Sequence, residues 1–280
     1  MRLTCRSLVV LALLWCLVSN GSLVQAAEAK KILLLGQSPD GHPPGTHEYM
    51  PGVEVLAKLL KKSPGVELQV VNADNPWNEG PELLNDADGV VLFLSQGAKW
   101  TQEEPRRRDA FARLAARGGG LAVIHWGMGT RDAKDIDAFL KLFGGCHGGP
   151  DRKYKVVPKA SVQIVDKQHP VTTGVDAFTI DEEFYYRLKF VKASPGVKPI
   201  LKTNIEDHLE TVCWIWERPD GGRSFGFSGG HFHQNWRHEP VRRLLAQAVL
   251  WTVKQPVPKD GLNVGIRTQD LQLKPLSRPE

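Results

Sequence analysis

The stretch Lys31-Ile32-Leu33-Leu34-Leu35-Gly36 decides the fold, because it is a short, continuous apolar run that ends in glycine. A strand buried on both faces of a parallel sheet has this pattern, whereas a strand with one solvent-exposed face alternates apolar and polar residues. We therefore expect residues 31–36 to form the first strand of a parallel sheet.

The following segments alternate between helical and strand patterns. Apolar side chains recur at helical spacing over residues 53–60, and Ser63-Pro64-Gly65 ends that segment. Thr101 and Glu104 have the spacing of a capping box, which predicts a helix from there to about Arg117. Further strands are predicted at 66–71, 88–94 and 121–124. Strands that alternate with helices imply right-handed crossovers, so we expect an α/β fold with a three-layer, doubly wound, mostly parallel sheet.

After Gly149 the predicted strands become shorter, at about 160–165, 197–201, 211–216 and 223–227. They are expected to extend the sheet or to form an antiparallel flap. A last helix over 241–253 has its apolar residues on one face and closes the core. No linker or repeat divides the chain, so residues 27–255 are expected to form one domain, followed by a surface tail at 256–280.

The first 26 residues have the order of a secretory signal peptide. Arg2 and Arg6 precede an apolar run of about 11 residues, and small residues follow near Ala26. The run is too short to cross a bilayer comfortably, although an uncleaved anchor is the alternative. We expect a secreted or periplasmic protein with no membrane segment after cleavage.

Charge and cysteine content limit the function classes. The chain has 36 Lys and Arg against 31 Asp and Glu, and loss of Arg2 and Arg6 lowers the net charge from +5 to +3. This charge is too small to indicate nucleic acid, and no dinucleotide-binding or P-loop motif indicates a nucleotide cofactor. An exported protein could join Cys146 to Cys213, but a domain of this size needs no such bond. A homo-oligomer is compatible with the sequence.

Polar residues concentrate where the predicted strands end. Ligands of open parallel sheets bind at the carboxyl ends of the strands, so these residues are candidates for a site. Five of the nine histidines are among them. The residues are Asp40, His42, His47 and Glu48 after the first strand, His125 and Trp126 after residues 121–124, and His231 and His233 after residues 223–227.

The stretch Gly229-Gly230-His231-Phe232-His233 is the most suggestive of a site. On an extended backbone the two imidazoles would project to the same side, about 7 Å apart at their Cα atoms. Zinc and similar ions accept such ligands. The structural alternative is a hydrogen-bonded turn before the last helix, just as His47 and Glu48 could simply begin a helix.

Two other groups of residues could carry chemistry. In Asp181-Glu182-Glu183, paired acids stand beside aromatic residues, and strand alternation would direct Asp181 and Glu183 to one side and Glu182 to the other. A solvated acidic turn is the alternative. A thiolate at Cys146 beside His147 would support a cysteine hydrolase, but adjacent residues usually point apart.

Five segments in order resemble the ThuA-like (trehalose utilisation) family. The segments are Gly36-Gln37-Ser38 with His47-Glu48-Tyr49, Gly118 to Trp126, His169-Pro170-Val171-Thr172, Asp181 to Tyr185, and Gly229-Gly230-His231-Phe232. The resemblance implies a flavodoxin-like fold of the class I glutamine amidotransferase type. It also implies carbohydrate metabolism, particularly of keto-sugars and glycosides. True amidotransferases carry a nucleophilic cysteine after the strand that corresponds to 121–124, whereas this chain has His125, which argues against glutaminase chemistry.

The resulting hypothesis is an exported enzyme that binds a small carbohydrate and uses a divalent metal, with zinc as the best candidate. The reaction would be that of a hydrolase, lyase or isomerase. A non-catalytic periplasmic sugar-binding or scaffold module is the alternative, and convergence of the histidines would distinguish the two. The predicted metal ligands are His47, His125, His231 and His233, the predicted catalytic residues are Glu183, Glu48 and His125, and the predicted sugar contacts are Trp126, Tyr185 and Trp236.

Overall fold

The computed structural model describes residues 28–273. The predicted signal peptide, residues 1–26, lies outside the described residues, as does the end of the predicted tail, 274–280.

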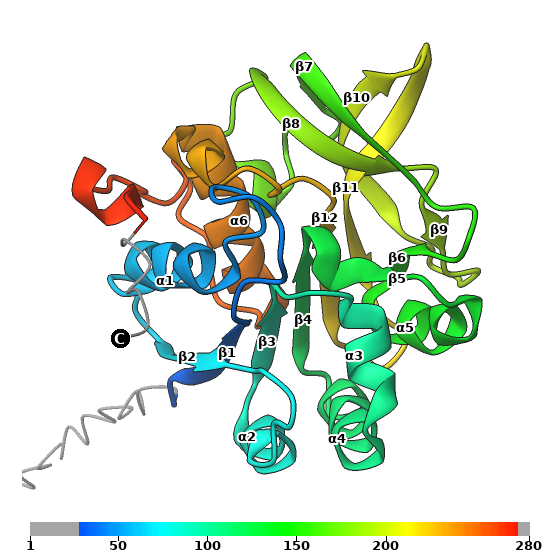
Figure 1. Ribbon diagram of the computed structural model, residues 1–280. Helices are drawn as coiled ribbons and strands as arrows, with labels where there is room; N and C mark the ends of the chain where they lie inside the picture. Colours follow the sequence, from blue (N-terminus) through cyan, green and yellow to red (C-terminus); the bar gives the residue numbers. More distant parts are fainter. Residues whose placement is uncertain (1–27, 274–280) are drawn as a thin grey trace, which may run out of the picture.

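One nine-stranded sheet runs through the molecule in the order β2-β1-β3-β4-β12-β11-β10-β7-β8 (Figure 1). The strands are β1 Lys30–Gly36, β2 Val66–Asn72, β3 Gly89–Leu92, β4 Gly120–Ile124, β7 Lys153–Ile164, β8 Phe178–Tyr186, β10 Lys198–Ile205, β11 His208–Glu217 and β12 Arg223–Phe227. A small second sheet contains β5 Gly129–Thr130, β6 Gly145–Gly148 and β9 Lys189–Phe190.

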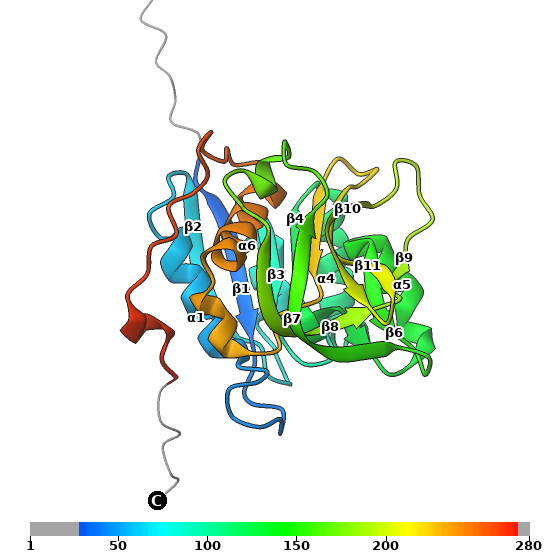
Figure 2. The same cartoon turned by 90° about the horizontal axis from the view of Figure 1, so that it is seen from above.

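Helices cover both faces of the parallel part of the sheet, which makes three layers (Figures 1 and 2). One face carries α1 and α6, and the other carries α2 to α5. The helices are α1 Tyr49–Leu60, α2 Gly80–Asp86, α3 Gly97–Glu103, α4 Pro105–Ala116, α5 Ile136–Phe143 and α6 Glu239–Thr252. Among the described helices, none has the length and apolar character needed to span a membrane.

The first strand is buried on both faces, as its sequence predicts. Ile32 and Leu34 belong to the core beneath α1 and α6, whereas Leu33 and Leu35 belong to the core beneath the other helices. Successive side chains of a strand point to opposite faces, so a continuous apolar run supplies both cores at once.

The expectation of a mostly parallel sheet is not confirmed, because the sheet is mixed. The pairs β2–β1, β1–β3, β3–β4 and β4–β12 are parallel, and every pair from β12 outward to β8 is antiparallel. The connection from β10 to β11 shows the reason. Glu206 and Asp207 form a two-residue turn with φ values of 50° and 65°. So short a turn can join only antiparallel neighbours, since a parallel crossover needs a dozen or more residues.

The predicted capping box at Thr101 is wrong. Thr101 lies inside α3, where its hydroxyl donates to the carbonyl of Ala98. The N-cap of the next helix is Glu104, whose carboxylate accepts hydrogen bonds from the amides of Arg106 and Arg107. Pro105 follows at the first helical position, where its missing amide costs nothing.

The remaining differences concern the ends of elements. β7 begins at Lys153, seven residues before the predicted strand, and it pairs with β8, which is the last strand of the sheet. The tail after Pro256 does not only run over the surface. Val264 is buried, and its carbonyl accepts a hydrogen bond from Arg242 of α6.

Candidate functional site

A cluster of three histidines and one glutamate lies where several elements meet at one end of the parallel strands. His47 comes from the loop after β1, His125 follows β4, His231 follows β12, and Glu183 lies on β8. One nitrogen or oxygen from each of the four lies within 4.8 Å of the others. We call this set the histidine cluster.

The backbone brings His47 and His231 together. The amide of His47 donates to the carbonyl of His231 at 3.0 Å, and Thr46 forms an antiparallel bridge with Phe232. The amide of His233 donates to the carbonyl of Gly45 at 2.8 Å. The loop after β1 is therefore held against the loop after β12 by a short piece of antiparallel pairing.

Two members of the cluster have unusual backbone conformations. His47 has a φ of 51° and His125 a φ of 49°, both in the left-handed region that non-glycine residues rarely adopt. Such conformations cost about 1–3 kcal/mol each, and they collect at functional sites, where the surrounding structure holds them in place. Six other described non-glycine residues outside the cluster also have positive φ, so the case for the site rests on the side-chain contacts of His47 and His125.

The hydrogen bonds of His125 and His47 determine which nitrogens carry protons. His125 Nδ1 lies 2.8 Å from the carbonyl oxygen of Ser228, which can only accept. His47 Nδ1 lies 3.0 Å from Asp40 Oδ2, which also accepts from the Tyr49 hydroxyl. Both Nδ1 atoms are thus donors. In a neutral imidazole the other nitrogen then carries a lone pair and no proton.

Asp40 can hold His47 Nδ1 as a hydrogen-bond donor because the Asp40 carboxyl stays ionised. Burial disfavours its charge, but hydrogen bonds from His47, Tyr49 and His42 lower the pKa of the Asp40 carboxyl well below its usual range. A carboxylate that holds the far nitrogen of an imidazole is the usual support of a metal-binding histidine.

The unprotonated Nε2 atoms of His47 and His125 face each other, and His231 Nδ1 lies beside them. His125 Nε2 lies 3.1 Å from His47 Nε2 and 3.2 Å from His231 Nδ1. Burial lowers the pKa of all three imidazoles, that of His231 to about 4 and that of His125 well below its usual value, so at neutral pH none is charged. No proton then lies between His47 Nε2 and His125 Nε2, and their lone pairs repel. Ligand nitrogens of a tetrahedral zinc ion lie roughly 3.3 Å apart, a separation close to that of these atoms.

Glu183 completes the cluster from β8. Its Oε1 lies 3.5 Å from His231 Nδ1 and 3.8 Å from His125 Nε2, farther than a good hydrogen bond. Burial raises the pKa of the Glu183 carboxyl. The spacing leaves this oxygen free to bind an ion or to accept a proton.

Glu182 faces the opposite side of β8, as strand alternation predicts. It is 1% exposed and accepts hydrogen bonds from the amides of Glu183, Gly230 and His231 and from the side chain of Asn235. Burial raises the pKa of Glu182 to about 7, although these hydrogen bonds oppose the shift. Glu182 thus fixes the backbone that carries His231, and a solvated acidic turn is excluded.

A cavity of about 300 Å³ opens beside the histidine cluster. On its wall the Tyr185 ring is stacked between His125 and His147, with ring centroids 4.3 and 3.9 Å apart. The Tyr185 hydroxyl lies 3.0 Å from His125 Nε2. The lining residues are His42, His47, Trp126, Arg131, His147, Arg152, Tyr154, Glu183, Tyr185 and His231.

Three residues that the sequence places in the site lie elsewhere. Phe232 is extended, but a 3-10 turn, His233–Arg237, begins directly after it, and His233 Nε2 lies 3.1 Å from the carbonyl of Leu271, outside the cluster. Glu48 accepts from the amide of Gly45 just before α1. Trp236 packs in the core, so of the three predicted sugar contacts only Trp126 and Tyr185 line the cavity.

The sequence interpretation missed Asp40 as a support for His47, and His147, Arg131, Arg152 and Tyr154 as cavity residues. The sequence places Asp40 after the first predicted strand, but the spacing of residues does not show that its carboxylate binds the His47 imidazole. Cys146 is no nucleophile candidate, because burial raises the pKa of its thiol to about 12. Cys146 and Cys213 are both buried free thiols.

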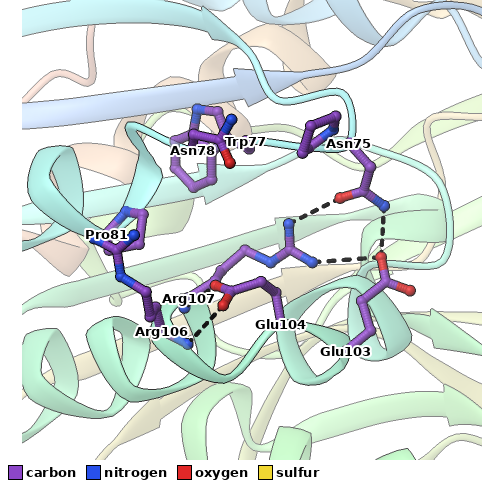
Figure 3. A pocket seen from close by; sticks show the side chains of 9 residues that line it. Asn75, Trp77, Asn78, Pro81, Glu103, Glu104, Arg106 and Arg107 are labelled. Carbon is purple, nitrogen blue, oxygen red and sulfur yellow. Dashed lines mark hydrogen bonds and ion pairs between the residues drawn. The ribbon is translucent and has the colours of Figure 1, made fainter.

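A second cavity, of about 270 Å³, lies between α2 and α4 and shares no lining residue with the first (Figure 3). Its polar groups already bind one another. Arg107 donates to Asn75 and Glu103, and Arg106 pairs with Glu82. We therefore place the candidate site at the histidine cluster.

Comparison with known proteins agrees with the resemblance. The family model described as ThuA, trehalose utilisation, matches residues 41–252. A ThuA-like protein from Bacteroides uniformis is 18% identical, with a TM-score of 0.60, and the match covers 82% of this chain and 94% of that one. A ThuA-like protein from Parabacteroides merdae is 16% identical, with a TM-score of 0.56 and coverage of 88% and 100%. The glutaminase domain of CTPS from Trypanosoma brucei is 12% identical, with a TM-score of 0.46 and coverage of 84% and 99%. No curated protein matches the chain.

Proposed function

Because the chain belongs to the ThuA (trehalose utilisation) family, we propose that it is an enzyme acting on a carbohydrate with the help of a divalent metal ion at the histidine cluster. Zinc is the first candidate, since three imidazoles and one carboxylate form a typical zinc-binding set. The proposed ligands are His47, His125 and His231, with Glu183 as fourth ligand or as general base.

The facing nitrogens of His47 and His125 carry this proposal. Each has its second nitrogen held as a donor, by Asp40 and by Ser228, so the two lone pairs meet at 3.1 Å. Tyr185 can donate one proton to His125 Nε2, but that leaves His47 Nε2 without a donor. A shared cation would satisfy both nitrogens, and the supports from Asp40 and Ser228 are those that metal-binding histidines need.

The chemistry follows from the residues around the ion. A bound zinc ion would polarise a sugar carbonyl or lower the pKa of a bound water. The raised pKa of Glu183 suits it to accept a proton at its Oε1. Tyr185 and Trp126 offer aromatic surface beside the ion for a sugar ring. These roles fit a hydrolase, lyase or isomerase that acts on keto-sugars or glycosides.

A non-catalytic sugar-binding module is the competing function. Such a module would need polar and aromatic groups in the cavity but no convergence of unprotonated imidazole nitrogens. The convergence within 4.8 Å therefore favours the metal-assisted enzyme.

Elemental analysis of the purified, dialysed protein tests the proposal. We expect about one zinc, manganese or nickel ion per chain, and a loss of most of it in His125→Ala and in His231→Ala. His233→Ala is the matched control, because its side chain binds the carbonyl of Leu271 outside the cluster and the variant should keep its metal. Absence of metal under all loading conditions, or equal metal content in all variants, would reject the metal mechanism.

A further inference from the structure

Two arginines line the cavity beside the histidine cluster, and the proposed metal chemistry does not use them. Arg131 follows β5, and Arg152 lies in the loop between β6 and β7. The cavity therefore receives two guanidinium groups from two different segments of the chain.

Neither arginine has a carboxylate partner among the described residues. The acids next to them in sequence are engaged by lysines, since Asp132 pairs with Lys134 and Asp151 pairs with Lys189, both at 2.9 Å. Both guanidinium groups are thus without an ion pair among the described residues, and the one acid in the cavity lining, Glu183, belongs to the histidine cluster. Arg152 and Lys189 also help burial to lower the pKa of the nearby His147 imidazole to about 3.

Arg152 is also held in place. Its Nη1 donates to the carbonyl of Gly149 at 3.1 Å, and its guanidinium lies 6.0 Å from the centre of the Trp126 ring. A guanidinium with fixed orientation loses less entropy when it binds a ligand, and it can present two parallel N–H groups to a carboxylate or a phosphate.

Aromatic surface for a sugar ring lies between Arg152 and the histidine cluster, since Arg152 lies over Trp126, Trp126 contacts Tyr185, and Tyr185 stacks on His125. Trp126 and Tyr185 line the same cavity, and Tyr154 is 59% exposed at its rim. A sugar ring against these aromatic side chains would place one end near the histidines and a charged substituent near the arginines.

We propose that the substrate of this site is an anionic sugar, whose carboxylate or phosphate is bound by Arg131 and Arg152. This inference rests on the proposed function, because it takes the cavity beside the histidine cluster as the sugar site. It narrows the substrate from carbohydrates in general to acidic sugars or sugar phosphates.

Calorimetric titration with glucose, glucuronate and glucose 6-phosphate tests the inference. We expect at least one of the two anions to bind ten or more times more tightly than glucose, and the tighter one identifies the anionic group. In Arg131→Gln and Arg152→Gln that preference should fall about tenfold, while the metal content stays unchanged. Arg106→Gln is the control, because Arg106 lines the other cavity and pairs with Glu82.

The titrations are repeated after metal removal, because a carboxylate could bind the metal itself. A preference that persists without metal and disappears in the arginine variants supports the inference, even if the metal mechanism fails. Equal binding of all three sugars, or a preference that is lost with the metal and kept in both arginine variants, would overturn it.

Discussion

His125 is the residue on which the candidate site depends. Its Nε2 contacts His47, His231 and Tyr185, its Nδ1 is held by Ser228, and its ring stacks on Tyr185. It directly follows β4, a strand that is buried on both faces, so its position is determined by the core of the sheet. Its left-handed backbone turns the side chain into the cluster at a cost that the packing around β4 has to offset.

Asp40 should matter for metal affinity although it is not a proposed ligand. Asp40→Asn removes the anion that holds His47 Nδ1, and the loss of such a support typically weakens metal binding 10–100-fold. Zinc competition titration measures this effect. Asp74→Asn, which alters an aspartate that binds Ser38 and Asn72 in a neighbouring loop, should keep the wild-type affinity. Equal affinities of the two variants would contradict the role of Asp40.

His147 should make the protein sensitive to acid. Its pKa is lowered from 6.5 to about 3, first by burial and then by Arg152 and Lys189, so the unfolded chain binds the proton more tightly than the folded one. The stability that depends on neutral His147 is complete above pH 6.5 and is lost as the pH falls from 6.5 towards 3. Replacement by phenylalanine preserves a ring against Tyr185 and removes the titrating group.

Urea unfolding between pH 7.5 and pH 4 measures this dependence. His147→Phe should lose less stability than the wild type over that range, although His125 and His231 still contribute. His208→Phe, at an exposed position on β11, should follow the wild-type curve. Parallel curves for His147→Phe and the wild type would show that His147 does not cause the acid sensitivity.

At the scale of elements, β8 is the strand that joins fold and site. Its alternation directs Glu183 and Tyr185 into the cavity, and it directs Glu182 towards the loop that carries His231. One strand therefore supplies a proposed ligand, an aromatic wall and the support of another ligand. A shift of its register by one residue would exchange all these roles.

The start of α4 gives a test of an element by itself. Glu104→Ala removes the carboxylate that accepts from the amides of Arg106 and Arg107, so it should lower the free energy of unfolding. Asp109→Ala, which removes only a surface ion pair with Arg108, should cost less. Denaturant unfolding compares the two variants, and a larger loss for Asp109→Ala would show that Glu104 is not the functional cap.

At the scale of the whole molecule, the histidine cluster draws on segments that are far apart in the chain. The loop before α1, the end of β4, β8 and the loop after β12 all meet there. Binding at such a site stabilises only the folded chain, because the unfolded chain does not bring these side chains together.

Metal should therefore raise the melting temperature. Free zinc at 100 times its dissociation constant adds about 2.7 kcal/mol. For a domain of this size that corresponds to roughly 5–10 °C. Differential scanning calorimetry with zinc and with a chelator measures the shift, and His125→Ala should show almost none. A shift of the same size in that variant would place the stabilising metal elsewhere.

The sequence alone determined the first four strands of the parallel part of the sheet and the positions most worth inspecting. Burial of a strand on both faces is a local property of its residues, so β1 and β4 could be recognised from their apolar runs. The rule that ligands bind at the carboxyl ends of parallel strands then selected His47, His125 and His231, which the structure brings together. Strand alternation likewise separated Glu182 from Glu183.

Only the tertiary structure decided which side chains share the site and how the sheet continues. His233 lies outside the cluster because a 3-10 turn begins there, and a pattern of two histidines cannot show where the chain turns. His147 and Arg152 belong to the site through contacts with segments far away in the sequence, and Asp40 belongs to it because the path of its own loop brings it to His47. The direction of β11, β10, β7 and β8 depends on their connections and pairing partners. Local periodicity records how a segment is buried, but the partners of a side chain are determined by the path of the whole chain.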